Sequence, residues 1–556
     1  MKKHRLWSFL LILGLVLGLA SPYLSAEAET EDPPIGIENE YVGDWEEPYE
    51  YVFYWNNDYQ TLYDWGVDKT SAEWKEKFNI DIEFIRADTD AAAHLNLMIT
   101  SGDLPDALWL DRDANLFRMV EMGLLQEIDS LRENNPTYDA YVGESTRDLL
   151  RIDGDLYTIP GWARKSSATG GNYSWLYNKK IWEACGSPEM KTLEDLEAFM
   201  IQAKELGKTE DDQDIIPFIT DVIPAHFWIY EAAHRSLGGG ARLNYWYEPF
   251  QGKLVNFLDS ERSLEALKRA NSWYREGLIE DSIFSDTRDQ FIEKLVAGRA
   301  ALMYFDFSLD DVYQFRQLLI QDQPDNDYIV LTDPIFPAGN GMSQDQIYPD
   351  YKPTTGGYGV HISAQAENPQ RIFDFHSYLM SQRAAIEQQF GPQGELWTEL
   401  DDNDYPIMDK FDSELNASER DALGLWFWMM PGHADSVDLV KFAVNDQKSD
   451  DLKSWVAIHQ QEVFTPVQFM TDEFFGLSDT IDPLEDLGIQ RTECEDKIAV
   501  EMPKILMAES EEACQQLIDD LRSWLNDNGM PEIVERYDAK YQKNIETQGF
   551  TAFDVQ

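Results

Sequence analysis

Strand-like and helix-like segments alternate over residues 49–110, and this alternation restricts the fold more than any other feature of the chain. Residues 49–55 are a run of β-favouring aromatic and branched side chains, and residues 81–86 alternate as a second strand. Helical patterns over residues 68–78 and 90–100 separate these strands from a short apolar run at 107–110. Strands separated by helices predict an α/β fold with a mostly parallel sheet and crossover helices. At 556 residues the chain is also too long for one core, so two or more domains are expected.

The N-terminus has the three parts of an export signal. Basic residues stand within the first five positions, an apolar run follows over residues 6–20, and small residues flank Glu27. The apolar run is too short to span a bilayer, so we predict a signal peptide over residues 1–28 and a secreted mature protein. Residues 29–48 are acidic and contain Pro33, Pro34 and Pro48, which predicts an extended acidic tether.

The charge of the chain excludes several classes of partner. It carries 103 acidic and 45 basic residues, a formal net charge of −58. Such a surface repels phosphate backbones, so nucleic acid is excluded, and anionic membranes are equally unsuitable. The same field disfavours polyuronate ligands and favours neutral ones.

Several motifs occur in an order that carries a family resemblance. Residues 101–106 read Ser-Gly-Asp-Leu-Pro-Asp between a helix and a strand, and residues 153–160 read Asp-Gly-Asp-Leu-Tyr-Thr-Ile-Pro. Residues 175–186 read Trp-Leu-Tyr-Asn-Lys-Lys-Ile-Trp-Glu-Ala-Cys-Gly, and residues 390–397 read Phe-Gly-Pro-Gln-Gly-Glu-Leu-Trp. Together with a return strand over residues 357–363, these motifs resemble the carbohydrate-binding family 1 extracellular solute-binding proteins of bacterial ABC importers.

The resemblance implies a two-lobed, periplasmic-binding-protein-like fold with a ligand cleft between the lobes. It assigns residues 49–165 and 357–400 to the N-terminal lobe, and residues 166–356 and 401–556 to the C-terminal lobe. The expected crossing segments lie near 163–174, 354–358 and 398–402.

The function implied is that of an exported receptor, not an enzyme. It would capture a neutral oligosaccharide as a monomer and deliver it to the transmembrane subunits of an ABC importer. The alternatives are a secreted carbohydrate-active hydrolase, which needs a pair of carboxylates, and a sugar-sensing receptor component. The sequence shows no phosphate-binding loop, no His-Glu-x-x-His and no Gly-x-Ser-x-Gly.

The chain lacks the cysteine by which the lipid-anchored members of this family are held at the cell. These carry a cysteine directly after a Leu-Ala-Ser-like run, whereas Ser21 is followed here by Pro22, and the first cysteine is Cys185. We therefore expect a periplasmic or freely extracellular protein without a lipobox cysteine.

Candidate ligand-binding residues follow from the chemistry of sugars. Aromatic rings suit the apolar face of a pyranose, and Asp, Asn and Arg suit its hydroxyl rim. Ligands of open α/β sheets bind beyond the carboxyl ends of the strands. Trp246 and Asp306 resemble cleft positions of the family, and Trp397 and Trp428 lie in or near an insertion of its longer members. The predicted set is Trp55, Asn56, Asp58, Trp109, Asp111, Arg112, Trp162, Trp175, Trp246, Asp306, Trp397 and Trp428.

One family element is broken. Longer members often carry a calcium loop, which corresponds here to residues 208–217. This segment is shorter and lacks the glycine that the sharp turn of such a loop needs. Asp211, Asp212 and Asp214 are the candidate metal ligands, but the pattern favours a solvated acidic turn, and no cofactor is expected.

Overall fold

The computed structural model describes most of the chain. The described residues are 41–56, 63–86, 91–164, 174–222, 224–239, 246–305, 309–348, 350–410, 415, 417–428, 432–482 and 485–549. The predicted signal peptide, most of the predicted tether and the candidate residues Asp58 and Asp306 lie outside this set.

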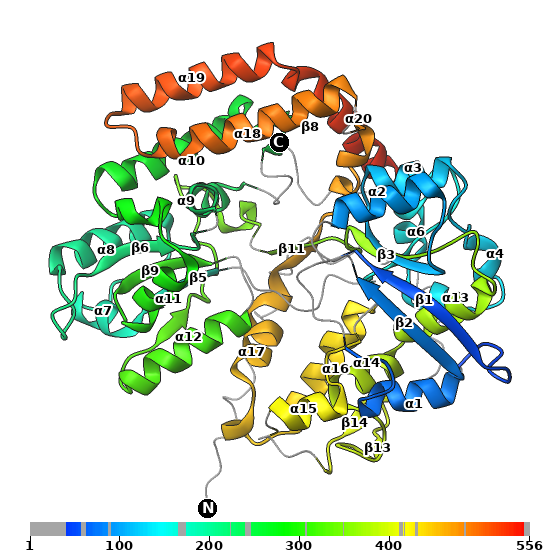
Figure 1. The fold of residues 1–556 in the computed structure, drawn as a ribbon. Helices are drawn as coiled ribbons and strands as arrows, with labels where there is room; N and C mark the ends of the chain where they lie inside the picture. The colour runs from blue at the N-terminus through cyan, green and yellow to red at the C-terminus, as the bar shows by residue number, and fades with distance from the viewer. Residues whose placement is uncertain are drawn as a thin grey trace, which may run out of the picture.

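A five-stranded sheet in the order β2-β1-β3-β12-β4 forms the centre of the first lobe (Figure 1). Its strands are β1 (Tyr49–Trp55), β2 (Ile80–Arg86), β3 (Ala107–Asp111), β4 (Ile159–Pro160) and β12 (Tyr358–Ile362). β1 is parallel to β2 and β3, whereas β12 is antiparallel to β3 and β4. The start of β12 therefore lies beside the carboxyl end of β3, although the two strands are more than 240 residues apart in the sequence.

Helices cover both faces of this sheet because side chains alternate along its strands. Leu108 and Leu110 of β3 pack into a core with residues of α2 and α3, and Trp109 packs into a second core on the other face. The helices of this lobe are α1 (Lys69–Phe78), α2 (Ala91–Ser101), α3 (Ala114–Glu121), α4 (Asp129–Arg132), α5 (Thr137–Tyr141), α6 (Glu144–Leu150), α13 (Pro369–Leu379) and α14 (Gln382–Phe390).

A four-stranded sheet in the order β10-β5-β9-β6 forms the centre of the second lobe. Its strands are β5 (Ser174–Asn178), β6 (Ile216–Thr220), β9 (Ala300–Phe305) and β10 (Tyr328–Val330). Around it lie α7 (Lys179–Ala184), α8 (Leu193–Leu206), α9 (Ala225–Ser236), α10 (Glu261–Arg275), α11 (Arg288–Val296), α12 (Leu309–Asp322) and the hairpin β7 (Tyr247–Phe250) with β8 (Lys253–Asn256). The α/β prediction is confirmed, and Figure 1 shows the two sheets in separate halves of the molecule.

Three chain segments lie side by side between the two sheets. Ala163 forms an antiparallel bridge with Thr355 and a parallel bridge with His433. The Ala163 amide donates to the Gly432 carbonyl at 3.0 Å, and the Arg164 amide donates to the Thr354 carbonyl at 2.8 Å. We call residues 161–164, 354–357 and 432–434 the crossing segments. The third differs from the sequence expectation: residues 399–400 form β13, which pairs with β14 (Pro406–Ile407) in a local hairpin.

The segment that contains α15 (Ala417–Leu423) and α16 (Ala434–Asp446) packs on the first lobe, although the family resemblance implies the second. α16 contacts α14, and Trp428 lies in the same core as the residues of β1. The Trp428 indole Nε1 donates to Asp68 Oδ2 at 3.0 Å, and Asp68 also caps α1 by accepting from the Ser71 amide at 2.9 Å. One buried carboxylate thus joins the segment of α15 and α16 to the first lobe, across 360 residues of sequence.

The described end of the predicted tether is also packed on the first lobe. Tyr41 stacks on Tyr378 with ring centroids 5.2 Å apart, and Trp45 meets Phe78 edge-on at 4.9 Å. Residues 41–48 are therefore part of the fold, contrary to the tether prediction, because their aromatic side chains cover the apolar surface of α1 and α13.

The C-terminal part of the chain extends the second lobe and reaches the first. α18 (Asp486–Leu506) and α19 (Glu511–Asp527) join the core of the second lobe, while α20 (Met530–Gln548) contacts both α18 and α6. Between the lobes, β11 (Asp350–Lys352) pairs with β15 (Gln468–Met470), and α17 (Trp455–Ile458) contacts α12 and α16.

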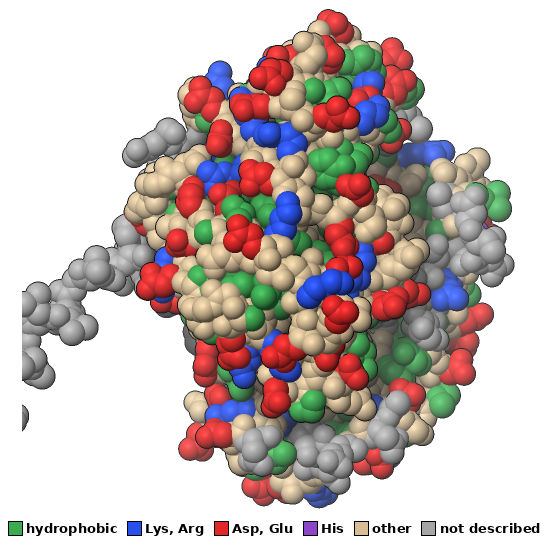
Figure 2. Space-filling view, turned by 90° about the vertical axis from the view of Figure 1, so that its left-hand side faces the viewer, with side chains coloured by type: hydrophobic (Ala, Val, Ile, Leu, Met, Phe, Trp, Pro, Cys, Tyr) green, Lys and Arg blue, Asp and Glu red, His purple; other side chains and the backbone are tan. Residues whose placement is uncertain are grey.

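One face of the second lobe carries side chains of both charges. Figure 2 shows the outer face of the second lobe, where acidic side chains are spread among basic and apolar ones without forming one block. Within the described part of the chain, no helix combines the length and the apolar character that crossing a membrane requires.

Candidate functional site

Aromatic side chains from distant parts of the sequence gather at the carboxyl end of β1 and β3. Trp55 and Trp109 are register partners, and their rings stack 4.5 Å apart with an interplanar angle of 8°. The Tyr358 ring follows at 5.1 Å from Trp109, since β12 starts opposite the end of β3. Trp162 stands on the adjoining crossing segment. We call Trp55, Trp109, Tyr358 and Trp162 the aromatic edge.

Two glycines allow the backbone to lie against these rings. A Cβ at Gly161 would be 2.4 Å from Tyr358 Cδ2 and 2.8 Å from Trp109 Cη2. A Cβ at Gly356 would be 2.4 Å from Trp162 Nε1. Because these separations are far below van der Waals contact, the aromatic edge requires glycine at both positions of the crossing segments.

The members of the aromatic edge differ in access to solvent. Trp55 and Trp109 are 1% and 6% exposed and form its base, whereas Trp162 and Tyr358 are half-buried. The Trp55 indole Nε1 is buried and has no hydrogen-bond acceptor among the described residues. Tyr358 was not predicted from the sequence. The sequence does show that Tyr358 stands at the start of the predicted return strand. It does not show that this strand lies next to β3, which is what brings Tyr358 to the aromatic edge.

Two polar side chains accompany the rings. Asn56 follows Trp55, and its side-chain oxygen accepts a hydrogen bond from the Tyr54 hydroxyl at 3.0 Å, while its backbone N–H donates to the Trp109 carbonyl. Asp111 is exposed at the end of β3, and desolvation by surrounding protein, helped by the nearby Asp113, raises the pKa of its carboxyl. An aromatic base with amide and carboxylate groups beside it has the composition of a sugar-binding surface.

Arg112 has a different role from the one predicted. Its Nε donates to Asp479 Oδ2 at 2.8 Å and its Nη1 donates to the Leu150 carbonyl at 3.0 Å. The side chains of the pair are only 8% and 11% exposed, and Phe117 and Phe475 lie against the guanidinium. The guanidinium therefore ties the end of β3 to the C-terminal part of the chain and points away from the aromatic edge.

A buried carboxylate supports the crossing segments. Asp472 Oδ1 accepts from the Thr354 amide at 2.6 Å, and burial raises the pKa of Asp472 to about 6. Arg164, whose charge partly offsets that effect, lies with its guanidinium carbon 5.2 Å from the centre of the Trp162 ring. Hydrogen bonds thus connect three segments next to the aromatic edge, namely residues 161–164, 354–357 and 471–472.

The second sheet presents a smaller set of groups at the corresponding edge. Trp175 stands near the start of β5 and is fully buried between Phe218 and Tyr304, each 5.6 Å away. Asp221 follows β6 and pairs with Arg288, with Nη1 2.7 Å from Oδ2. The residues after β9, where Asp306 was predicted, lie outside the described set.

Three further predicted tryptophans are core residues in the structure. Trp246 packs between Phe227 and Phe257, and Trp397 is fully buried with its Nε1 donating to the Gly391 carbonyl at 2.9 Å. Trp428 is 2% exposed and belongs to the core of the first lobe. The rings of these residues and of Trp175 are enclosed by protein. The candidate site therefore consists of the aromatic edge and does not include them. Sequence position alone does not distinguish a buried indole from one that lines a cleft.

The acidic turn after α8 is closed by an ion pair. Lys208 Nζ lies 2.7 Å from Asp214 Oδ1, and these two residues also form an antiparallel bridge. Lys208 thus forms an ion pair with Asp214, one of the three carboxylates predicted as candidate metal ligands. Among the described residues, no three His, Cys, Asp or Glu side chains converge as a metal site would require.

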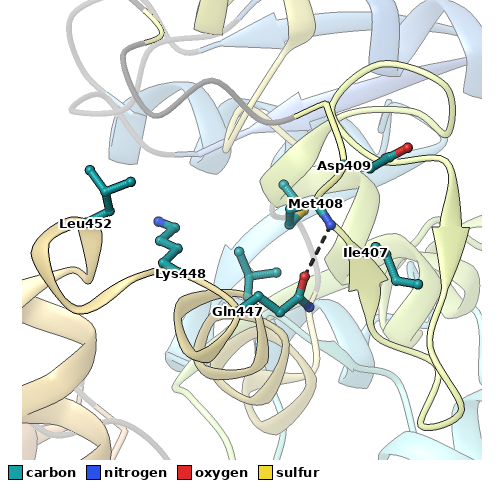
Figure 3. A pocket seen from close by; sticks show the side chains of 7 residues that line it. Ile407, Met408, Asp409, Gln447, Lys448 and Leu452 are labelled. Carbon is teal, nitrogen blue, oxygen red and sulfur yellow. Dashed lines mark hydrogen bonds between the residues drawn. The ribbon is translucent and has the colours of Figure 1, made fainter.

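A separate surface pocket lies between the end of β14 and the end of α16. It has a volume of about 230 Å³ and is lined by Ile407, Met408, Asp409, Val444, Gln447, Lys448 and Leu452. Figure 3 shows Gln447 reaching toward the Met408 backbone, whose amide donates to Gln447 Oε1 at 3.2 Å. The pocket contains none of the predicted site residues and no aromatic side chain.

Comparison with solved structures identifies the fold. An HMO-binding, ABC-transporter-associated solute-binding protein from Bifidobacterium longum infantis superimposes with a TM-score of 0.63, 18% identity, and coverage of 89% of this chain and 99% of that one. An extracellular solute-binding protein from Bifidobacterium longum subsp. infantis gives a TM-score of 0.65 at 17% identity, covering 89% and 98%. FusA of Streptococcus pneumoniae in complex with kestose gives 0.60 at 16% identity, covering 89% and 99%. The chain therefore has the two-lobed fold of solute-binding proteins.

Sequence comparison gives a more limited result. No family model matches the chain. The fructooligosaccharide ABC transporter substrate-binding protein FusA of Streptococcus pneumoniae serotype 4 is 24% identical over 242 residues. The aligned stretch covers 40% of this chain and 43% of that protein, less than half of either.

Proposed function

We propose that this protein is an exported receptor that binds an oligosaccharide between its two lobes and delivers it to an ABC importer. It acts as a monomer, catalyses no reaction, and depends on a separate ATPase for the energy of transport. Closure of one lobe toward the other buries the sugar and presents both lobes to the transmembrane subunits.

The observation that carries this proposal is the position of the aromatic edge. Partly exposed Tyr358 and Trp162 stand at the carboxyl end of β1 and β3, Trp162 on a segment that crosses between the lobes and Tyr358 directly after another. Asn56 and Asp111 supply hydrogen-bond acceptors beside them. Rings for the apolar face of a sugar and polar groups for its hydroxyls thus meet at the place where a movement of the lobes encloses a ligand.

The comparisons support the same proposal. The two most informative relatives are FusA, which is named for fructooligosaccharide and was solved with kestose, and the HMO-binding protein. Both align over nearly their whole solved chains. Export is supported by the predicted signal peptide over residues 1–28.

Thermal unfolding of residues 29–556 with a panel of oligosaccharides tests the proposal. The panel contains kestose, nystose, maltotriose, a mannose–N-acetylglucosamine disaccharide and an alginate trimer, each also assayed for cleavage products. A sugar at 100 times its dissociation constant stabilises the folded state by about 2.7 kcal/mol, which is a shift of several degrees at most for a chain of this size. We expect one class of sugar to raise the melting temperature without being cleaved.

Two results contradict the proposal. Shorter products in any mixture assign the protein to the hydrolases, for which a carboxylate pair must then be found. If the protein unfolds cooperatively and no sugar raises its melting temperature, the proposal that it is a sugar receptor is wrong.

A further inference from the structure

The end of β3 places a carboxylate beside the accessible ring of the aromatic edge. Asp111 is the register partner of Tyr358 and lies two residues after Trp109, so it shares a sheet face with that indole. Its side chain is exposed, whereas Trp109 and Trp55 behind it are covered. A ligand stacked on Tyr358 or Trp162 therefore meets the Asp111 carboxylate at the same edge of the sheet.

The neighbouring cations do not neutralise this carboxylate. Arg112 is directed to Asp479 and to the Leu150 carbonyl, with its side chain 8% exposed. Arg164 is 6% exposed and lies over the Trp162 ring. Asp113, the next acidic residue, accepts from the Asn115 and Leu116 amides as the cap of α3. Desolvation, together with this like charge, raises the pKa of the Asp111 carboxyl.

We propose that Asp111 is a specificity-determining residue that makes this site select neutral oligosaccharides over uronate-containing ones. The inference rests on the proposed function and adds to it the class of sugar and the residue that sets it. The carboxylate accepts hydrogen bonds from the hydroxyls of a neutral sugar, a charge-assisted interaction. A uronate at the same position brings a second negative charge within a few ångströms, where repulsion is only partly screened.

The sequence charge alone does not supply this selectivity. A net charge of −58 acts on every anion that approaches the protein and is screened beyond about 10 Å at 0.1 M ionic strength. Asp111 acts at contact distance, so its effect persists at physiological salt and depends on one side chain.

The test compares Asp111→Asn with a matched control. Glu183→Gln removes the same charge from the exposed face of α7 in the second lobe, far from the aromatic edge in Figure 1. The probes are kestose, trigalacturonate and trimannuronate, and the methyl esters of both uronates, which keep the rings but lose the charge. Calorimetric titrations at 0.05 M and 0.15 M salt give the ratio of acidic to esterified affinity for each protein.

We expect Asp111→Asn to raise that ratio at least about fivefold, with most of the gain retained at 0.15 M salt. Glu183→Gln leaves it within twofold. An unchanged ratio in Asp111→Asn, with neutral probes still bound, overturns the inference while leaving the receptor intact. An equal gain in both variants also overturns it, in favour of the overall field. If wild type binds neither the neutral probes nor the esters, the proposed function and this inference fail together.

Discussion

Replacing Gly161 with alanine is expected to weaken oligosaccharide binding at least tenfold and to lower the free energy of unfolding by about 1–3 kcal/mol. The new methyl group would stand 2.4 Å from the Tyr358 ring and 2.8 Å from the Trp109 ring, so at least one ring must move. Stacking on an aromatic ring contributes up to about 1.5 kcal/mol, so displacing Tyr358 accounts for a tenfold loss. Calorimetric titration with the sugar that stabilises the wild type measures the first effect, and denaturant unfolding measures the second.

Gly357→Ala is the matched control for this experiment. Gly357 directly precedes β12, in the same crossing unit, but a Cβ there meets nothing within 4 Å. Both glycines lack a left-handed backbone conformation, so only the space around the added methyl differs. Equal affinities for the two variants would show that the aromatic edge does not form the binding surface.

Replacing Arg112 with alanine is expected to cost about 3 kcal/mol of unfolding free energy. The variant leaves the Asp479 carboxylate, 11% exposed, without the guanidinium that pairs with it at 2.8 Å. Breaking a buried pair costs about 3–5 kcal/mol, and the nearby positive charge of Lys540 places the loss at the lower end. Urea unfolding gives the value directly.

Two further variants identify the cause of that loss. Lys69→Ala removes the cation of the exposed pair Lys69–Glu395 and should cost less than about 1 kcal/mol. Adding Asp479→Asn to Arg112→Ala should recover more than half of the loss, because the unpaired charge disappears. A cost for Arg112→Ala as small as that for Lys69→Ala would mean that the pair does not hold the lobe to the C-terminal segment.

Local patterns predicted the elements around the site well. The expected strand at residues 49–55 is β1 to the residue, and the expected helices at 68–78 and 90–100 match α1 and α2 within one residue at each end. These segments combine clear periodicity with caps such as Asp68, so nearby residues determine their limits. The position of Trp55 and Trp109 at strand ends followed from the same patterns.

Long-range contacts determined what sequence patterns did not predict. Trp428 and α16 belong to the first lobe because of contacts with Asp68 and α14, which are about 360 and 50 residues away in the sequence. Tyr358 enters the aromatic edge through an antiparallel pairing, and Arg112 is directed away from it by Asp479, 367 residues later. The position of each of these side chains depends on which distant segment packs next to it. A single sequence does not show which segments these are.

Hydrogen exchange with and without the stabilising sugar tests most directly whether the ligand binds at the aromatic edge. In the ligand complex, we expect slower exchange for amides of residues 161–164, 354–358 and 432–434, together with the end of β3. Amides around the pocket of residues 407–409 and 444–452 serve as the internal reference and should not change. Protection confined to that pocket, with the crossing segments unaffected, would show that the sugar does not bind at the aromatic edge.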